Sequence, residues 1–131
     1  MHQALLKIVE SKAVWNDRTH FYRLAATAVQ HAVVDHVRKR LSQKRGGGAE
    51  RVAADPALRE MVRGDADLVV LGDLLDDLAQ AEPRKADVVR LRYFGGLPMK
   101  EVAHVLRVSV PTIERDCRTA LVWLASEMRK G

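Results

Sequence analysis

The chain has few of the features that mark secreted or membrane-spanning proteins. Cys117 is its only cysteine, so an internal disulfide is impossible and a reducing cytoplasm is expected. Apolar runs are short: residues 68–71 are bounded by Asp67 and Asp73, and no stretch approaches the length of a membrane span. The first residues do not combine a basic segment with an apolar core, so no secretory signal is expected. These absences predict a cytoplasmic protein without a membrane span.

Residue combinations that carry catalysis are also lacking. The glycines at 46–48 are not followed by Lys-Ser/Thr, so they do not form a phosphate-binding loop. The aspartates within residues 73–77 have no partner base and are typical of a solvated acidic face. Cys117 lies beside two arginines that could lower its pKa, but no His or Asn stands in a triad-like context. The sequence therefore predicts neither an enzyme nor a bound cofactor.

A metal site is conceivable only on the first long helical segment. His31 and Asp35 are four residues apart, with His36 next to them, but no third ligand has convincing spacing. Asp35 is expected to pair with Arg38 or Lys39 instead. No metal is predicted.

Charge is unevenly distributed over the 131 residues. The net charge is +5, and 47% of residues are hydrophobic, as in globular proteins. Residues 1–48 hold nine Lys/Arg and three Asp/Glu, residues 49–83 hold three and nine, and residues 84–131 hold ten and five. Two basic blocks flank an acidic one, which suggests two surfaces for a polyanion such as nucleic acid. Solvated helix faces would produce the same charge pattern.

Helix-forming residues dominate, and no window alternates with the period of a strand. Helices are expected over about residues 2–11, 19–43, 67–80, 83–94, 98–106 and from 109 to beyond 124. Residues 46–66 contain three consecutive glycines and two further turn signals, which predict a flexible linker with at most a weak helix. The predicted fold is all-α, with two small helical modules (1–45 and 67–131) joined by the linker 46–66.

A helix-turn-helix is the clearest functional pattern, within residues 95–116. A helix of about nine residues, a turn of about three and a longer helix with a Ser109 cap follow one another. Ala103 is small where the two helices must cross, and Val108 and Ile113 can fill the core between them. Such a crossing presents the start of the second helix to the major groove. An ordinary helical hairpin is the alternative.

Eight residues of this unit are candidate DNA contacts. Arg115 and Arg118 can reach guanine edges or phosphates, and Ser109 and Thr112 can donate to phosphate at the helix N-terminus. The set comprises Lys100, Ser109, Val110, Pro111, Thr112, Glu114, Arg115 and Arg118.

The order of motifs resembles the extracytoplasmic-function (ECF) sigma factors of bacterial RNA polymerase. The first half carries His20-Phe21, Val34-Asp35-His36-Val37-Arg38 and Lys44-Arg45-Gly46-Gly47-Gly48. The second half carries Pro83-Arg84-Lys85-Ala86, Val88-Val89-Arg90-Leu91-Arg92-Tyr93-Phe94-Gly95-Gly96-Leu97 and Thr112-Ile113-Glu114-Arg115-Asp116. The resemblance covers nearly the whole chain in the right order, which is more specific than a lone helix-turn-helix.

The resemblance implies a transcription initiation factor that binds promoter DNA and the RNA polymerase core, with an anti-sigma factor as a further partner. Residues 1–45 would form part of the region two-like module that opens and reads the −10 element. Residues 67–131 would form the region four-like module that reads the −35 element. Aromatic and basic side chains of the first module suit unstacked bases and DNA backbone. Its candidate contacts are His20, Tyr22, Arg23, Gln30, His31 and Arg38, while Phe21 is expected in the core.

Some positions depart from the family pattern. Arg107 stands where the family usually has glycine, which predicts a residue with positive φ in the turn. Cys117 replaces a usual tryptophan. Family members normally carry further helices before the match to residues 4–9, helices that contribute to the polymerase clamp. Two alternatives therefore stand beside the main interpretation: a truncated sigma-like DNA-binding regulator without polymerase recruitment, and a helical protein-interaction module.

Overall fold

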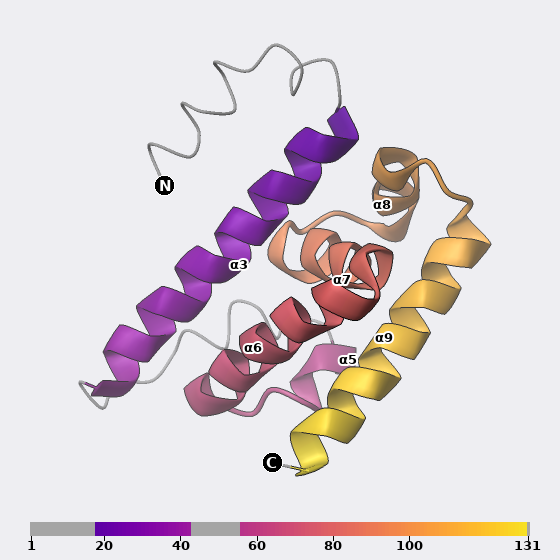
Figure 1. Ribbon diagram of the computed structural model, residues 1–131. Coiled ribbons are helices and arrows are strands. Elements are labelled where there is room, and N and C mark those ends of the chain that lie inside the picture. The colour runs from indigo at the N-terminus through magenta and orange to yellow at the C-terminus, as the bar shows by residue number, and fades with distance from the viewer. Residues whose placement is uncertain (1–17, 43–55, 131) are drawn as a thin grey trace.

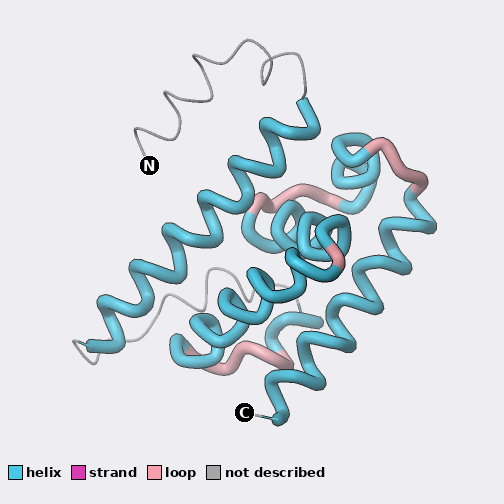
Figure 2. Tube along the Cα trace, viewed as in Figure 1, coloured by secondary structure: helices cyan, strands magenta, loops and turns pink. Residues whose placement is uncertain are grey.

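The computed structural model describes residues 18–42 and 56–130, and this part of the chain contains helices and no strands (Figure 2). Its elements are α3 (Arg18–Ser42), α5 (Pro56–Arg59), α6 (Asp65–Ala81), α7 (Pro83–Val89), the π-helical turn η1 (Arg90–Phe94), α8 (Met99–Leu106) and α9 (Val110–Lys130). The predicted all-α class is confirmed. The helix expected over residues 2–11 and the three glycines at 46–48 lie outside the described residues.

The helix α6 lies at the centre of the arrangement. It packs against α3 on one side and against α7 and α9 on the other (Figure 1). Leucines at three- and four-residue spacing form its buried face, as the sequence predicted: Leu68, Leu71, Leu75 and Leu78. Burial of each such side chain contributes about 1.5–3 kcal/mol to stability. Two apolar clusters therefore join α3 to the helices that follow, one around the leucines of α6 and one around the helix-turn-helix.

The closest approach in this interface is at Gly72 of α6. A Cβ atom at that position would lie 2.7 Å from Cγ2 of Val34 on α3, well inside the van der Waals distance. Val34 and Val37 of α3 are buried. Ala26, nearer the N-terminus of α3, is buried in the cluster that contains the helix-turn-helix residues Val102 and Ile113. Small residues thus allow α3 to lie directly on its neighbours.

Part of the predicted linker belongs to this core. Leu58 on α5 and Val62 just after it are both buried, at 0% and 3% exposure. Within the predicted linker, these two apolar side chains belong to the same core cluster as the leucines of α6. The short α5 is the weak helix expected there. Residues 46–55 lie outside the described residues.

Local signals set the helix ends in the C-terminal half. Pro83 occupies the start of α7, where its missing N–H costs nothing. The helix η1 ends at Gly95 and Gly96, and Gly96 has a φ of +73°, a conformation that favours glycine. Both ends agree with the sequence prediction. No helix in the described ranges is long and apolar enough to cross a membrane.

Candidate nucleic-acid interface

The turn between α8 and α9 has the backbone of a tight helix-turn-helix. Arg107 adopts the left-handed conformation, with φ 58° and ψ 43°, and its N–H lies toward the carbonyls of Ala103 and His104. The N–H of Val108 donates to the carbonyl of Ala103 at 3.1 Å. Bonds of this kind satisfy the last carbonyls of a helix and turn the chain sharply. The positive φ expected at Arg107 is confirmed.

Apolar residues fix the crossing of the two helices. Val102 and Ile113 are fully buried, and Ala103 is 5% exposed. They share a core cluster with Val88 and Leu91, on which Val108 also packs. The small side chain at the crossing and the two predicted core residues lie where the sequence analysis expected them.

The N-terminus of α9 carries a serine cap. Ser109 Oγ accepts a hydrogen bond from the Thr112 N–H at 3.3 Å and lies 2.8 Å from Thr112 Oγ1. The cap satisfies the Thr112 N–H and Pro111 has no N–H, so an anion at this helix start would be bound by the Val110 N–H and the Ser109 and Thr112 hydroxyls. The predicted Ser109 cap is confirmed.

The eight candidate contacts of this unit remain accessible. Pro111, Glu114, Arg115 and Arg118 lie at positions i, i+3, i+4 and i+7 of one α9 face, and all four are exposed. Lys100 and Ser109 are exposed as well, whereas Val110 and Thr112 are partly buried. The structure thus leaves a helix face with two arginines and one glutamate open to solvent.

An ion pair with a buried carboxylate, which the sequence analysis did not identify, holds α9 against α7. Arg84 Nε lies 2.6 Å from Asp116 Oδ2, and Asp116 is 5% exposed. Next to it, the sulfur of the buried Cys117 lies 3.7 Å from the Tyr93 hydroxyl. Asp116 follows two exposed charged residues in sequence, so helical periodicity around the buried Ile113 was the one signal that could have placed it inside.

The first helix presents its candidate contacts differently. His20 and Tyr22 are exposed near the start of α3, and the Tyr22 ring meets Phe21 edge-on, with centroids 5.6 Å apart. Phe21 is half-buried rather than a core residue. Further along α3, Arg23 Nε lies 2.7 Å from Asp87 Oδ2, and Arg38 Nη2 lies 2.8 Å from Asp73 Oδ1.

Gln30 is a core residue in this structure, which corrects its proposed exposure to DNA. It is 1% exposed, and its Nε2 donates to the Gly72 carbonyl and to Asp76 Oδ1, each at 3.1 Å. Its Oε1 accepts from Arg90 Nε at 2.6 Å. An amide that is fully hydrogen-bonded inside the protein has no group left for a base edge. Sequence reasoning missed this because the partners are about 42 to 60 positions away in the chain.

Asp76 is the common acceptor of this polar cluster. Besides Gln30 it contacts Arg90 Nη2 at 2.7 Å and His31 Nε2 at 3.1 Å. Burial acts to raise the pKa of Asp76, but hydrogen bonds from His31 and Gln30 and the nearby positive charges outweigh it, so the pKa lies below its usual value. His31 therefore lies against a carboxylate of α6.

Asp87 has the opposite shift. Burial raises the pKa of Asp87, and the charges of Arg23 and Arg90 offset this effect only in part.

Arg38 pairs with Asp73 rather than with Asp35 as the sequence had suggested. Within the described ranges, no three His, Cys, Asp or Glu side chains are grouped so that they could hold a metal ion.

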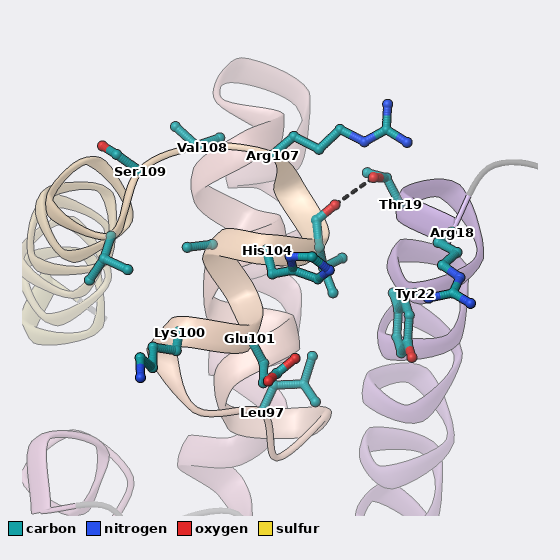
Figure 3. Close-up of a pocket in the computed structure, with 13 residues that line it drawn as sticks. Arg18, Thr19, Tyr22, Leu97, Lys100, Glu101, His104, Arg107, Val108 and Ser109 are labelled. Atoms are coloured by element: carbon teal, nitrogen blue, oxygen red, sulfur yellow. Dashed lines mark hydrogen bonds between the residues drawn. The ribbon is translucent and has the colours of Figure 1, made fainter.

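An open groove of about 780 Å³ lies between the start of α3 and the helix-turn-helix. Figure 3 shows Arg18 and Tyr22 on the α3 side, opposite His104 and Glu101 of α8, with Arg107 reaching toward α3. Thr19 Oγ1 donates to the Val105 carbonyl and connects the two sides. The groove extends from the start of α9, at Ser109 and Val110, to Arg18 and Tyr22 at the start of α3.

Comparison with known proteins identifies the class of protein to which this interface belongs. The family model for "ECF sigma factor" matches residues 1–130, almost the whole chain. No curated protein and no solved structure matches the chain.

Proposed function

The chain belongs to the ECF sigma factor family, and from this premise we propose that α8 and α9 bind a promoter duplex of the −35 type. The family consists of sigma-like transcription initiation factors, which are not enzymes. The observation that carries the proposal is the exposed α9 face at the N-terminus of the helix, on top of a buried helix crossing. A helix-turn-helix inserts this end of its second helix into the major groove.

Each exposed side chain has a role suited to its chemistry. Arg115 and Arg118 would donate to guanine edges or phosphates, and Glu114 can accept from a cytosine amino group. The Ser109 and Thr112 hydroxyls and the Val110 N–H would bind a backbone phosphate. The ion pair between Arg84 and the buried Asp116 would help to keep the helix in a fixed orientation while it reads the duplex.

The remaining partners follow from the family. The protein would bind the RNA polymerase core in the cytoplasm, and α3 would contact the −10 region through His20, Tyr22, Arg23, His31 and Arg38. An anti-sigma factor would be a further partner. Gln30 is left out of the proposed contacts because its side chain is buried and hydrogen-bonded.

Fluorescence anisotropy at fixed salt tests the role of α9. The probe is a labelled duplex selected by its binding to the protein from a random-sequence pool. Arg115→Ala and Arg118→Ala should each weaken binding by about 1–3 kcal/mol, as expected for arginines that contact bases or phosphates.

The matched control removes two positive charges from the other end of the same helix, with Arg129→Ala and Lys130→Ala, both exposed. It should bind almost as tightly as the unmodified protein. A double variant at Arg115 and Arg118 that keeps full affinity would exclude this face of α9 as the reading surface, and so would equal losses in the variant and the control.

A further inference from the structure

We propose that three carboxylates of α6 and α7 compete with DNA for α3, so that the arrangement seen here is a closed state of the factor. The carboxylates, which we call the acidic latch, are Asp73, Asp76 and Asp87. This inference rests on the proposed function, because it concerns the regulation of the α3 contacts with promoter DNA.

Each carboxylate of the latch contacts one basic side chain of α3. Counting along the helix, Arg23 lies against Asp87, His31 against Asp76 and Arg38 against Asp73, at 2.7 to 3.1 Å. These three are α3 residues proposed to bind DNA. A carboxylate and a phosphate offer an arginine the same kind of oxygen acceptor at the same distance. An arginine held by the latch therefore has to release its carboxylate before it can bind a phosphate.

The latch is built to be reversible. Both side chains of the Arg38–Asp73 pair are exposed, at 50% and 62%, so water can replace each partner as they separate, and such a pair stabilises a fold only weakly. In the Arg23–Asp87 pair the arginine is 43% exposed and the carboxylate 9%, so water reaches this pair from the arginine side. A small open groove of about 230 Å³, lined by His31, Arg38 and Asp73 among others, also lets solvent reach the junction of α3 and α6.

The acidic block, residues 49–83, contributes carboxylates that contact α3, whereas the carboxylates of an ordinary solvated face would contact only water. Residues 49–83 hold nine acidic and three basic residues between two basic blocks. Two latch residues, Asp73 and Asp76, lie in this block and contact side chains of α3. The helix that carries them, α6, lies beside α3 (Figure 1). The DNA-contacting face of α9, in contrast, has no carboxylate of this block against it in any ion pair found among the described residues.

The first test neutralises the latch in the full chain with Asp73→Asn, Asp76→Asn and Asp87→Asn. The probe is a labelled single-stranded 20-mer DNA of mixed sequence, which α3 is proposed to bind through its aromatic and basic side chains. The triple variant should bind the probe about tenfold more tightly than the unmodified protein. The matched control, Glu60→Gln, Asp77→Asn and Glu82→Gln, removes the same charge from exposed carboxylates elsewhere and should show a much smaller gain.

A second variant opens the interface without any change of charge. In Gly72→Leu the new side chain would collide with Val34, since a Cβ alone would be 2.7 Å from Val34 Cγ2. Its single-stranded DNA affinity should also rise several-fold. Gly64→Ala is the control, because nothing lies within 4 Å of a Cβ at that position. This variant tests the latch even if the triple variant fails to fold, which far-UV circular dichroism would reveal.

Two results would overturn the proposal. The first is that neither the folded triple variant nor Gly72→Leu binds single-stranded DNA more tightly than its control. The second is that the gain persists after Arg23→Ala and Arg38→Ala are added, because the gain would then not come from α3. Duplex binding through Arg115 and Arg118 is measured in the same proteins: its absence contradicts the proposed function of α9, whereas its presence without a gain at α3 contradicts the latch alone.

Discussion

The two longest helices, α3 with 25 residues and α9 with 21, differ in what surrounds their polar residues. Both were predicted to contact DNA. On α9 the predicted face is exposed, and the one carboxylate buried near it, Asp116, is on the opposite side and pairs with Arg84. On α3 the predicted residues Arg23, His31 and Arg38 lie against aspartates of other helices.

The difference teaches that the sequence of a helix shows which of its residues could bind DNA but not whether the rest of the chain leaves them free. The apolar face of α9 packs against α6, α7 and α8, which precede it in one continuous described stretch of the chain. The polar face of α3 is covered by α6 and α7, which follow a segment of more than 20 residues. Local sequence patterns therefore predict the packing of α9 well, but they do not predict the polar contacts of α3.

The largest expected effect comes from Arg90, which holds α3 in place. Its guanidinium is 8% exposed and donates to both Gln30 and Asp76. In Arg90→Met both acceptors lose their buried donor, so the free energy of unfolding should fall by about 3 kcal/mol. Urea denaturation followed by circular dichroism measures it.

The control for that experiment lies on the other helix. Arg115→Met makes the same change at an exposed position of α9 and should alter stability by less than about 0.5 kcal/mol. Equal effects of the two substitutions would contradict the distinction between an anchored α3 and an open α9.

A smaller effect, an increase in stability, is expected from a substitution at Arg107 in the turn before α9. Arg107 has a φ of 58°, a conformation that costs a residue with a Cβ about 1 kcal/mol. Arg107→Gly should therefore stabilise the protein by about 0.5–1 kcal/mol. Arg107→Ala removes the same charge but keeps the Cβ, and it should show no gain in a thermal melt. A similar gain in both variants would attribute the effect to charge and not to the backbone.

The fold was largely predictable where the signals are local. Leucine spacing gave α6, Pro83 the start of α7, and the two glycines the end of η1. Ser109 and Arg107 were correctly predicted at the helix-turn-helix because caps and turns depend on a few adjacent residues. The class of protein also followed from motifs in their order along the chain, and the family match bears this out.

Contacts between distant segments were not predictable from those signals. Gln30 resembles any exposed polar residue of a helix, yet it is buried because Arg90, Asp76 and the Gly72 carbonyl satisfy its amide. Leu58 lies between a proline and a glycine that suggest a loop, yet it is buried against α6. In each case the deciding partner is a long-range neighbour, and periodicity contains no information about it.

The smallest expected effect is a difference in stability between variants at two aspartates of the latch, Asp87 and Asp76. The pKa of Asp87 is raised by burial, which means that its ionised form is disfavoured in the folded protein. A raised pKa contributes stability below the usual value of 3.8 that is lost as the pH rises through the folded-state pKa. Asp87→Asn resembles the protonated form, so at pH 7 it should leave the free energy of unfolding unchanged or increase it by up to about 0.5 kcal/mol.

Asp76 should behave in the opposite way, because its pKa is lowered. Its contribution is present above the usual value of 3.8 and is lost as the pH falls through the folded-state pKa. Asp76→Asn should therefore destabilise the protein at pH 7, and its difference from the unmodified chain should shrink in acid, as urea denaturation at both pH values would show. An unchanged stability in Asp87→Asn at pH 7 would mean that α3 can exchange the Asp87 carboxylate for a phosphate without unfolding its neighbours. A marked loss of stability in Asp87→Asn at pH 7 would instead make the Arg23–Asp87 pair a structural tie.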